Sequence, residues 1–390
     1  MRRHLFAAIA ALMVAAAAWF AYYQSGRLRV VARPEGTLAG PPVGRDGAVA
    51  WIERTGDEDR VVFAPRWRSP RILLSARGIM GVALDGDKAL VTRGEGQDAE
   101  LIAVDLRGGS QRQLTGVKGQ AYQVKVGDGV VAWLEERAAA IPAAAFVAAA
   151  GPVTVIKTAP EKGGVASLVT VLPEDAAAAD MKMAGPGRTQ LLGVSGGRVY
   201  WLEKQGRDEG GATLVRSAPT TGGKTEAVVA EPGLQQAVLL RDERRASGAP
   251  PSGWLVWTSD SLESAISRES RAIKRLSLPG GKPQVVADWL RRNILLMGSG
   301  SRSYVQDTEL LWRLGTERGQ QGVIYRGPGA IQTATVIGDQ QYLVLREVSQ
   351  SRRAKKAPAG SKRGGPPVSR TVIARRPVTW WGRVRGLVGG

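Results

Sequence analysis

Short alternating runs of apolar and polar residues recur along most of the chain, separated by turns rich in Gly and Asp. Alternation with a period of two is typical of strands that bury one face, and no convincing apolar stripe at helical spacing interrupts it. One unit recurs: a turn Gly, an apolar run ending in Trp, a Glu two residues later, a second strand, a Gly-Gly pair and a closing strand. It occurs at residues 46–53, 128–135 and 197–203, with a fourth copy at Trp254–Trp257. The pattern predicts an all-β protein built from a repeat.

The repeat length indicates which repeat architecture this is. The second strands of the repeats align at Trp51, Thr92, Trp133, Trp201, Trp257, Gln306 and Leu345. Their spacing is that of a four-stranded blade of about 40 residues, with longer loops in some steps. We therefore predict a β-propeller over residues 26–378 with seven blades, leaving six or eight as alternatives because the sixth repeat is the weakest. The last repeat lacks one strand, and the alternating residues 26–32 are expected to supply it and so close the ring.

The unit Gly-x-Val-Tyr-Trp at Gly197–Trp201, followed by a strand, Gly-Gly and a further strand, resembles the YWTD-type and TolB-type propeller repeats of exported bacterial proteins. The resemblance covers roughly residues 26–378 and rests on structural residues, so it implies a fold and no catalytic residue. Two departures are visible. The Ser-Pro-Asp-Gly phrase of TolB-type blades is absent, and no blade has Tyr-Trp-Thr-Asp in full.

The N-terminal residues predict a membrane segment. Leu5–Tyr23 is free of charge and ends in aromatic residues. At 1.5 Å per residue a helix of this length spans roughly 28 Å, close to the hydrocarbon core of a bilayer. No small-x-small site follows it, which favours a retained anchor (residues 1–25) over a cleaved signal peptide. We expect a single-pass protein of the cell membrane with its C-terminal domain on the periplasmic or extracytoplasmic side, although basic residues flank both ends of the span and leave its orientation open.

The formal charge of +19 is concentrated at the two ends of the chain. Residues 350–390 carry +11 and residues 1–35 carry +4, which leaves only +4 on residues 36–349. A basic loop rich in Pro and Gly (350–370) and a tail (379–390) containing Trp380, Trp381, Arg383 and Arg385 account for most of the excess. Paired Trp beside Arg suits a lipid interface, so an anionic lipid surface is an expected partner and a solvated tail is the alternative. Nucleic acid is disfavoured, because no aromatic stacking residues are interleaved with the basic run.

The recurring Glu residues are the candidate binding residues of the disc. Residues i and i+2 of a strand share a face, and equivalent positions of different blades are related by the rotation of the propeller. An acidic set at one rim would therefore comprise Glu53, Glu135, Glu203, Asp260 and Glu347. Its functional interpretation is a site for a cation or a cationic ligand. The simpler interpretation is that each Glu pairs with a basic residue nearby, for example Arg54, Lys204 or Arg346, and that each Trp is a wedge between blades.

The composition narrows the chemistry further. The chain has no Cys and one histidine, His4, which removes most nucleophile-plus-base catalysis and most zinc, copper and haem sites. No Walker loop, dinucleotide fingerprint or Gly-x-Ser-x-Gly elbow occurs. We therefore expect no cofactor, no metal and no enzymatic activity.

The function expected from these observations is a non-catalytic protein-interaction or ligand-binding module of the cell envelope, with an envelope protein as partner. The alternative is a hydrolytic, carbohydrate-active propeller that uses paired Asp and Glu. Long insertions at 138–151, 173–188, 241–253 and 259–271 are further places where recognition could be built.

Overall fold

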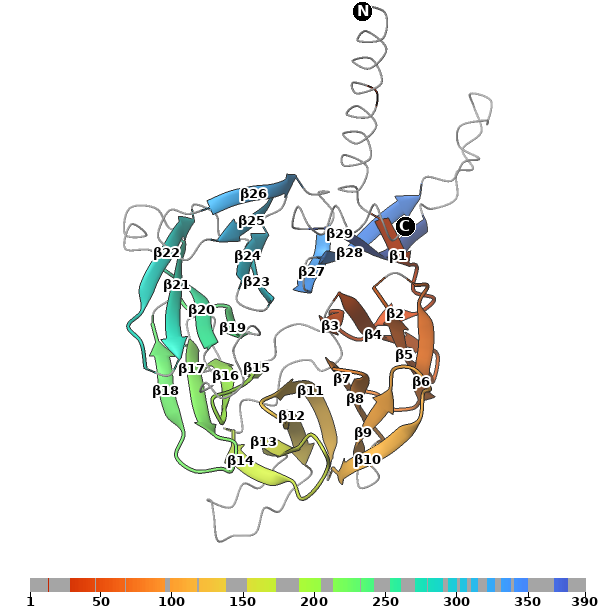
Figure 1. Ribbon diagram of the computed structural model, residues 1–390, viewed down its shortest axis with the longest axis horizontal. Helices are drawn as coiled ribbons and strands as arrows, with labels where there is room; N and C mark the ends of the chain where they lie inside the picture. The colour runs from red at the N-terminus through yellow and green to blue at the C-terminus, as the bar shows by residue number, and fades with distance from the viewer. Residues whose placement is uncertain are drawn as a thin grey trace, which may run out of the picture.

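The computed structural model shows a ring of seven β-sheets arranged around a central axis (Figure 1). It describes residues 13, 29–45, 47–66, 68–94, 99–117, 119–137, 153–172, 189–204, 213–231, 233–241, 253–260, 271–278, 280–289, 294–299, 302–306, 310–314, 321–326, 331–337, 340–349 and 368–377. The predicted seven-bladed propeller is confirmed, including its sixth blade.

Each blade is an antiparallel sheet whose strands follow chain order from the axis outward, except that the outermost strand of blade 7 comes from the beginning of the chain. Blade 1 comprises β2 (Thr37–Leu38), β3 (Val43–Arg45), β4 (Ala48–Thr55), β5 (Glu58–Ala64) and β6 (Arg71–Ala76); β2 and β3 both pair with β4. Blade 2 comprises β7 (Gly81–Asp85), β8 (Lys88–Arg93), β9 (Glu100–Asp105) and β10 (Gln111–Gly116). Blade 3 comprises β11 (Gln120–Gly127), β12 (Val130–Arg137), β13 (Val153–Pro160) and β14 (Ser167–Val171). Blade 4 comprises β15 (Thr189–Ser195), β16 (Arg198–Lys204), β17 (Thr213–Pro219) and β18 (Glu226–Ala230).

The remaining blades follow the same plan. Blade 5 comprises β19 (Ala237–Arg241), β20 (Gly253–Asp260), β21 (Arg271–Leu278) and β22 (Gln284–Trp289). Blade 6 comprises β23 (Leu295–Ser299), β24 (Arg302–Gln306), β25 (Leu310–Leu314) and β26 (Gln321–Arg326). Blade 7 comprises β27 (Ile331–Ile337), β28 (Gln340–Ser349) and β29 (Val368–Pro377), with β1 (Arg29–Ala32) as its outermost strand.

The ring is closed by β1, the first strand among the described residues. β1 pairs antiparallel with β29, with Arg29 opposite Arg375 and Ala32 opposite Ile373. The expectation that residues 26–32 complete the last blade is confirmed for Arg29–Ala32. Tyr342 of blade 7 strengthens the same junction, because its hydroxyl donates a hydrogen bond of 2.7 Å to the carbonyl of Gly47 in blade 1.

A β-bulge recurs between the third and fourth strands of all seven blades. In each blade one extra residue of the fourth strand is skipped in the pairing, and it is always aliphatic: Leu73, Leu114, Val169, Val228, Val286, Ile324 and Val31. The bulge recurs at the same point of every blade and so gives a structural reference for aligning the blades. The second-strand residues that pair with the third strand at this point are Trp51, Val91, Trp133, Trp201, Trp257, Val305 and Leu343.

This landmark corrects the alignment made from the sequence. Thr92 and Gln306 lie one residue beyond the Trp position, and Leu345 lies two residues beyond it. The cause is physical: alternation repeats every two residues, so without a Trp it does not fix which residue of a strand corresponds to which.

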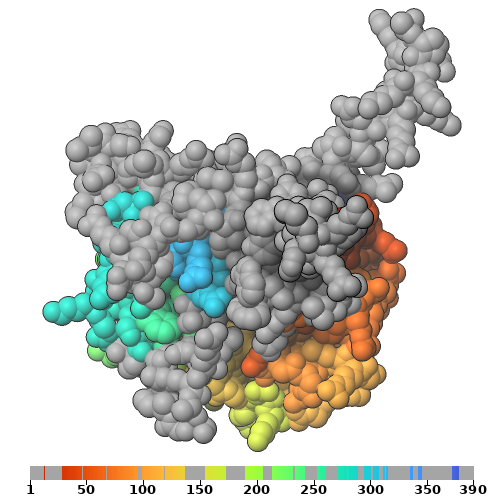
Figure 2. Space-filling model, turned by 45° about the horizontal axis from the view of Figure 1, so that its top comes forward, coloured from red at the N-terminus to blue at the C-terminus, as the bar shows by residue number. Residues whose placement is uncertain are grey.

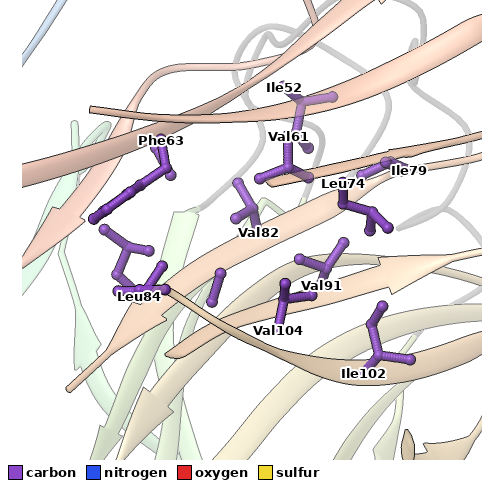
Figure 3. Close-up of a cluster of buried hydrophobic side chains, with 13 residues drawn as sticks. Ile52, Val61, Phe63, Leu74, Ile79, Val82, Leu84, Val91, Ile102 and Val104 are labelled. Carbon is purple, nitrogen blue, oxygen red and sulfur yellow. The ribbon is translucent and has the colours of Figure 1, made fainter. Parts of the chain in front are cut away.

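The core consists of apolar layers between neighbouring blades. Figure 3 shows one of them, in which Ile52, Val61 and Phe63 of blade 1 face residues of blade 2. The four Trp residues face the preceding blade in each case, and each is at most 1 % exposed. The interpretation of these Trp residues as wedges between blades is confirmed.

The predicted span Leu5–Tyr23 lies outside the described residues apart from Met13. Within the part of the chain that the structure describes, no helix has the length and apolar character needed to cross a bilayer.

Candidate functional site

Three neighbouring blades contain a recurring contact between a Trp, a carboxylate and a cation. In blade 3, Trp133 Nε1 donates to Glu135 Oε2 at 3.1 Å, and Lys157 Nζ lies 3.4 Å from Glu135 Oε1. The geometry follows from the strands: Glu135 is two residues from Trp133 on the same face, and Lys157 lies directly opposite Trp133 on the next strand. Glu135 is fully buried, so the Lys offsets the cost of burying its charge.

Blade 4 repeats the arrangement with a different cation. Trp201 Nε1 donates to Glu203 Oε2 at 3.3 Å, and Arg216, opposite Trp201, places its Nε 3.1 Å from the same oxygen. Glu203 is 4 % exposed. The cation therefore occupies the same strand position in both blades, while its chemistry differs.

Blade 5 obtains the carboxylate from elsewhere in the chain. Ser259 stands two residues after Trp257, and the acceptor is Glu231, which follows the last strand of blade 4. Trp257 Nε1 donates to Glu231 Oε2 at 3.2 Å, and Lys274 Nζ donates to the same oxygen at 2.8 Å. Burial raises the pKa of Glu231, but hydrogen bonds from Lys274, Trp257 and Ser259 outweigh it, so the net pKa is lowered. The contact in this blade joins two blades.

Blade 1 has the Trp and the Glu without the opposing cation. Trp51 Nε1 donates to Glu53 Oε1 at 2.7 Å, and the residue opposite Trp51 is Val62. Glu53 is 6 % exposed. Blades 2, 6 and 7 have Val91, Val305 and Leu343 at the Trp position and lack the contact altogether.

The predicted acidic set is thus distributed rather than assembled. Glu53, Glu135 and Glu203 are each buried in a separate blade against their own Trp. Asp260 pairs instead with Arg271, with Oδ1 2.7 Å from Nη1, at the end of β20. Glu347 lies in β28 with Arg370 as its strand partner, four residues beyond Leu343, so it is not equivalent to the other Glu residues. Among the described residues, no three His, Asp or Glu side chains are close enough to hold a metal ion.

A second cluster, which the sequence did not reveal, lies at the inner edges of blades 3, 4 and 5. Arg241, the last residue of β19, donates to the carbonyl of Val194 in β15 and packs against Gly127 at the end of β11. Lys125 of β11 lies close enough to Arg241 for the two charges to repel, and burial together with that repulsion lowers the pKa of Lys125. These residues are 116 positions apart, and only the ring brings them together.

A groove lies between blades 2 and 3, away from the central axis of the propeller. Its volume is about 680 Å³, and it is lined by Gln113, Leu114, Thr115, Gly116, Lys157, Gly164, Val165 and Ala166. The β13–β14 turn closes one side of it, because Gly164 N donates to Leu114 O at 3.2 Å; the yellow surface of this turn can be followed against the orange surface of blade 2 in Figure 2.

Both terminal segments meet the disc at one edge. β1 begins opposite Arg375, two residues before β29 ends at Pro377, so residues 1–28 and 378–390 join the same end of blade 7. Figure 1 shows β1 and β29 side by side at the rim. Arg29 and Arg68 are exposed at this end of blades 7 and 1, and Arg375 donates to the carbonyl of Arg66. The tail residues Trp380, Trp381, Arg383 and Arg385 lie outside the described residues.

Comparison with known proteins gives a fold and no family. No protein-family model matches the chain, and no curated protein matches its sequence. Among solved structures, an oligogalacturonate lyase in complex with manganese is 13% identical with a TM-score of 0.53, covering 90% of this chain and 92% of that one. The β-propeller domain of the Trilobed protease from Pyrococcus furiosus is 11% identical with a TM-score of 0.52, covering 89% and 97%.

A peptidase shows the same likeness over part of its length. Pyrococcus horikoshii acylaminoacyl peptidase is 11% identical with a TM-score of 0.50, and the match covers 85% of this chain but only 51% of the peptidase. This chain therefore spans about half of that enzyme. The Pyrococcus furiosus domain is described as having an open velcro topology, whereas here β1 pairs with β29. The chain is a seven-bladed β-propeller. At these identities the likeness supports the fold alone.

Proposed function

We propose that the protein is a membrane-anchored, exported propeller that acts as a non-catalytic interaction or ligand-binding module of the cell envelope. Within the propeller fold, we place its repeats with the YWTD-type and TolB-type repeats of exported bacterial proteins, on the strength of the Gly-x-Val-Tyr-Trp unit at Gly197–Trp201 that is followed by a strand, Gly-Gly and a further strand. An envelope protein is the expected partner.

The observation that carries the proposal is the common exit of the two chain ends. The apolar residues 5–23 and the Trp-containing tail both continue from the end of blade 7 at which β1 begins and β29 ends. A bilayer reached by the first segment is therefore within reach of the second. Arg29 and Arg68 at this edge complement an anionic surface, where each basic residue contributes on the order of 1 kcal/mol.

The non-catalytic part of the proposal is supported by what the buried acids do. The carboxylates of Glu135, Glu203 and Glu231 are committed to Trp N–H groups and cations within the blades. Carboxylates paired in this way stabilise the blades, so contacts with a ligand or partner would be made by the loops and the rims of the disc.

The test is extraction of the full chain from membranes of cells that express it, with Leu12→Arg as the variant and Val165→Arg as the control. Both substitutions add one charge, but Val165 is 89 % exposed on the disc, so its variant should behave as the wild type. We expect the wild type to stay in the membrane pellet through an alkaline wash and Leu12→Arg to be released, because a charge at the centre of a span costs roughly 2.5–3.5 kcal/mol. A wild-type protein found in the soluble fraction would contradict the anchor.

Export and partner binding have separate readouts. A reporter that is active only outside the cytoplasm, fused after Gly390, should be active, and its inactivity would place the disc in the cytosol. Cross-linking followed by capture of the full chain should recover an envelope protein in stoichiometric amount, and recovery of none would remove the interaction role.

A further inference from the structure

The two faces of the disc carry different connections between strands. Because equivalent strands run in the same direction in every blade, the turns from first to second strands and from third to fourth strands lie on one face. β1 begins and β29 ends on that face, so both terminal segments leave the disc there. We call it the exit face. The connections from second to third strands, and from each blade to the next, lie on the opposite face.

Charged residues are divided unequally between these faces. The count takes the described residues of each connection with the two strand residues on either side, including the end of β29 and the start of β1. On the exit face sixteen of these residues are Lys or Arg and six are Asp or Glu, whereas the opposite face has eight basic and ten acidic residues. By their sequence, the connecting residues outside the described set add a net −2 to the exit face and +2 to the opposite face. The exit face is therefore strongly basic, and the opposite face is close to neutral.

A basic residue recurs in the turns between the third and fourth strands on the exit face. In blades 2, 3, 4 and 5 it lies beside or one residue before the Gly-Gly pair, and blade 1 has an Arg in the same turn. All five side chains are exposed: Arg68, Arg107, Lys162, Lys224 and Lys282. Of the groups that the structure describes, none forms an ion pair with any of them. Because these turns join the two outermost strands of successive blades, they form an arc of positive charge along the rim.

Acids of the exit face are engaged within their own blades or turns. Asp85 is paired with Arg45, one blade away. Glu226 Oε2 lies 2.7 Å from Arg198 Nη2 in the same blade. Asp105 accepts hydrogen bonds of 2.8 and 2.6 Å from two backbone N–H groups of its own turn, and these bonds lower its pKa. These acids therefore do little to offset the arc of basic turns.

The exposed apolar side chains of the disc lie on the same face. Apart from Met13, the described residues include three large apolar side chains that are exposed: Val30 at 49 %, Ile72 at 54 % and Val165 at 89 %. Val30 and Ile72 are the second residues of β1 and β6, and Val165 lies in the β13–β14 turn, so all three belong to the exit face. Exposed apolar side chains beside basic ones suit a lipid interface, whereas single-stranded nucleic acid is bound by aromatic stacking.

We propose that the exit face binds the surface of a membrane that contains anionic lipids, so that the propeller lies flat on the bilayer. The inference deepens the proposed function: it rests on the membrane anchor to bring the disc to the bilayer, and it adds which face meets the lipid. Turns of successive blades are related by rotation about the axis, so their tips reach a flat surface together. Each basic residue within a Debye length of that surface adds to the attraction. The nearly neutral opposite face then points away from the membrane, where a partner meets it.

The experiment places a fluorescent label on one face at a time of the full chain, which has no Cys of its own. Ser110→Cys adds the attachment point in the β9–β10 turn of the exit face, and Ser75→Cys adds it near the end of β6 on the opposite face; both serines are exposed. The labelled chain is reconstituted into vesicles that contain a small fraction of lipid with a nitroxide headgroup, which quenches only dyes close to it. One set of vesicles contains phosphatidylglycerol, and the other consists of phosphatidylcholine.

In phosphatidylglycerol vesicles at low salt, the label at position 110 should be quenched at least about twofold more strongly than the label at position 75, because strands of this length separate the faces by about 20 Å. The difference should shrink in phosphatidylcholine vesicles and at about 1 M salt, where the Debye length falls to about 3 Å. Equal quenching of the two labels in phosphatidylglycerol, or stronger quenching at position 75, would overturn the proposal. Binding of a DNA duplex in place of lipid would assign the basic face to nucleic acid and overturn it as well.

Charge variants test whether the basic turns cause the docking. Lys162→Glu combined with Lys224→Glu reverses two exposed charges of the exit face, and Arg77→Glu combined with Lys204→Glu reverses two exposed charges of the opposite face. Losing two basic residues should lower the ratio of docked to free discs about 30-fold. At the salt concentration that releases half of the wild type, the first double variant should show the quenching seen with phosphatidylcholine, and the second should match the wild type. Equal quenching of the two double variants would contradict the assignment to the exit face.

Flotation of the same vesicles separates this proposal from the membrane anchor. An anchored chain floats with both lipid compositions, whatever the orientation of its disc. A chain that floats only with phosphatidylglycerol contradicts the anchor and supports the exit face as a lipid-binding surface. A chain that floats with both compositions and shows equal quenching of the two labels supports the anchor and overturns the orientation. A chain that floats with neither contradicts both.

Discussion

Blades 3, 4 and 5 differ from blades 2, 6 and 7 in how they fill the same position. The first group places a Trp there, with a carboxylate and a cation around its N–H, and the second places Val or Leu. Both groups pack against the preceding blade and carry the same bulge. The comparison shows that the propeller needs only an apolar residue at this position of the second strand. A Trp there also buries an indole N–H, which needs a hydrogen-bond acceptor. Blade 1 is intermediate, with a Glu and no opposing cation.

The largest expected effect comes from removing the Trp itself. Trp133→Ala should lower the free energy of unfolding by about 3–5 kcal/mol, because the side chain is fully buried between blades 2 and 3 and leaves a cavity. Val91→Ala at the equivalent position of blade 2 should cost clearly less, since fewer buried atoms are lost. Urea unfolding followed by far-UV circular dichroism checks both, and equal costs would show that the Trp is not the anchor of its blade.

The second-largest effect should come from breaking the ion pair of Glu135 and Lys157 beside Trp133. Glu135→Gln keeps an acceptor for Trp133 Nε1 but leaves Lys157 without its carboxylate, so we expect a loss of about 3 kcal/mol in the same urea assay. The double variant Glu135→Gln, Lys157→Met should recover most of the loss. If the double variant is as unstable as the single one, the ion pair is not the cause.

A smaller effect on stability depends on pH and tests the contact of Trp257, Glu231 and Lys274 in blade 5. The pKa of Glu231 is lowered below its ordinary value of 4.5, so its contribution to stability is present above that pH and is lost as the pH falls through the lowered value. Thermal unfolding of Glu231→Gln and the wild type should therefore differ at neutral pH and converge as the pH falls through the lowered pKa. Glu226→Gln, which breaks an exposed ion pair with Arg198, is the control and should show a smaller difference. A gap that stays constant with pH would contradict the assignment.

The smallest effect is expected in blade 1. Glu53→Gln keeps an acceptor for the Trp51 N–H, and no described cation loses a partner, so stability should change by no more than about 0.5 kcal/mol. The same unfolding assay applies. A loss as large as that of Glu135→Gln would mean that the opposing cation makes no difference between blades 1 and 3.

Much of the fold could be predicted from the sequence, because alternation and repeat length are local properties. The Trp residues, the Gly-Gly turns and residues 26–32 were enough for seven blades and for the closing strand. The bulges could not be predicted, since they are properties of pairing and not of one strand. In the three repeats that lack a Trp, alternation alone does not fix the register, and Thr92, Gln306 and Leu345 were misaligned for that reason. The aliphatic bulge residue is visible in the sequence once its place is known.

The candidate sites were less predictable for a related reason. Sequence spacing places Glu135 beside Trp133, but Lys157 reaches them only through strand register across a long loop. In blade 5 the sequence pointed to Asp260, and the carboxylate at the Trp is Glu231, which belongs to the end of another blade. Lys125 and Arg241 meet only because blades 3 and 5 both border blade 4. Contacts of this kind follow from the curvature of the ring.

The pairing of β1 with β29 also determines when the ring can close during synthesis of the chain. β1 leaves the ribosome before the other described strands and must wait for β29, and at roughly 5–20 residues per second that interval is on the order of tens of seconds. Throughout it, the growing row of blades has two open edges, which invite pairing with other chains. An N-terminal segment already inserted in a bilayer would hold β1 at a fixed place, so that the closing partner arrives at a waiting strand and the search is confined to one surface.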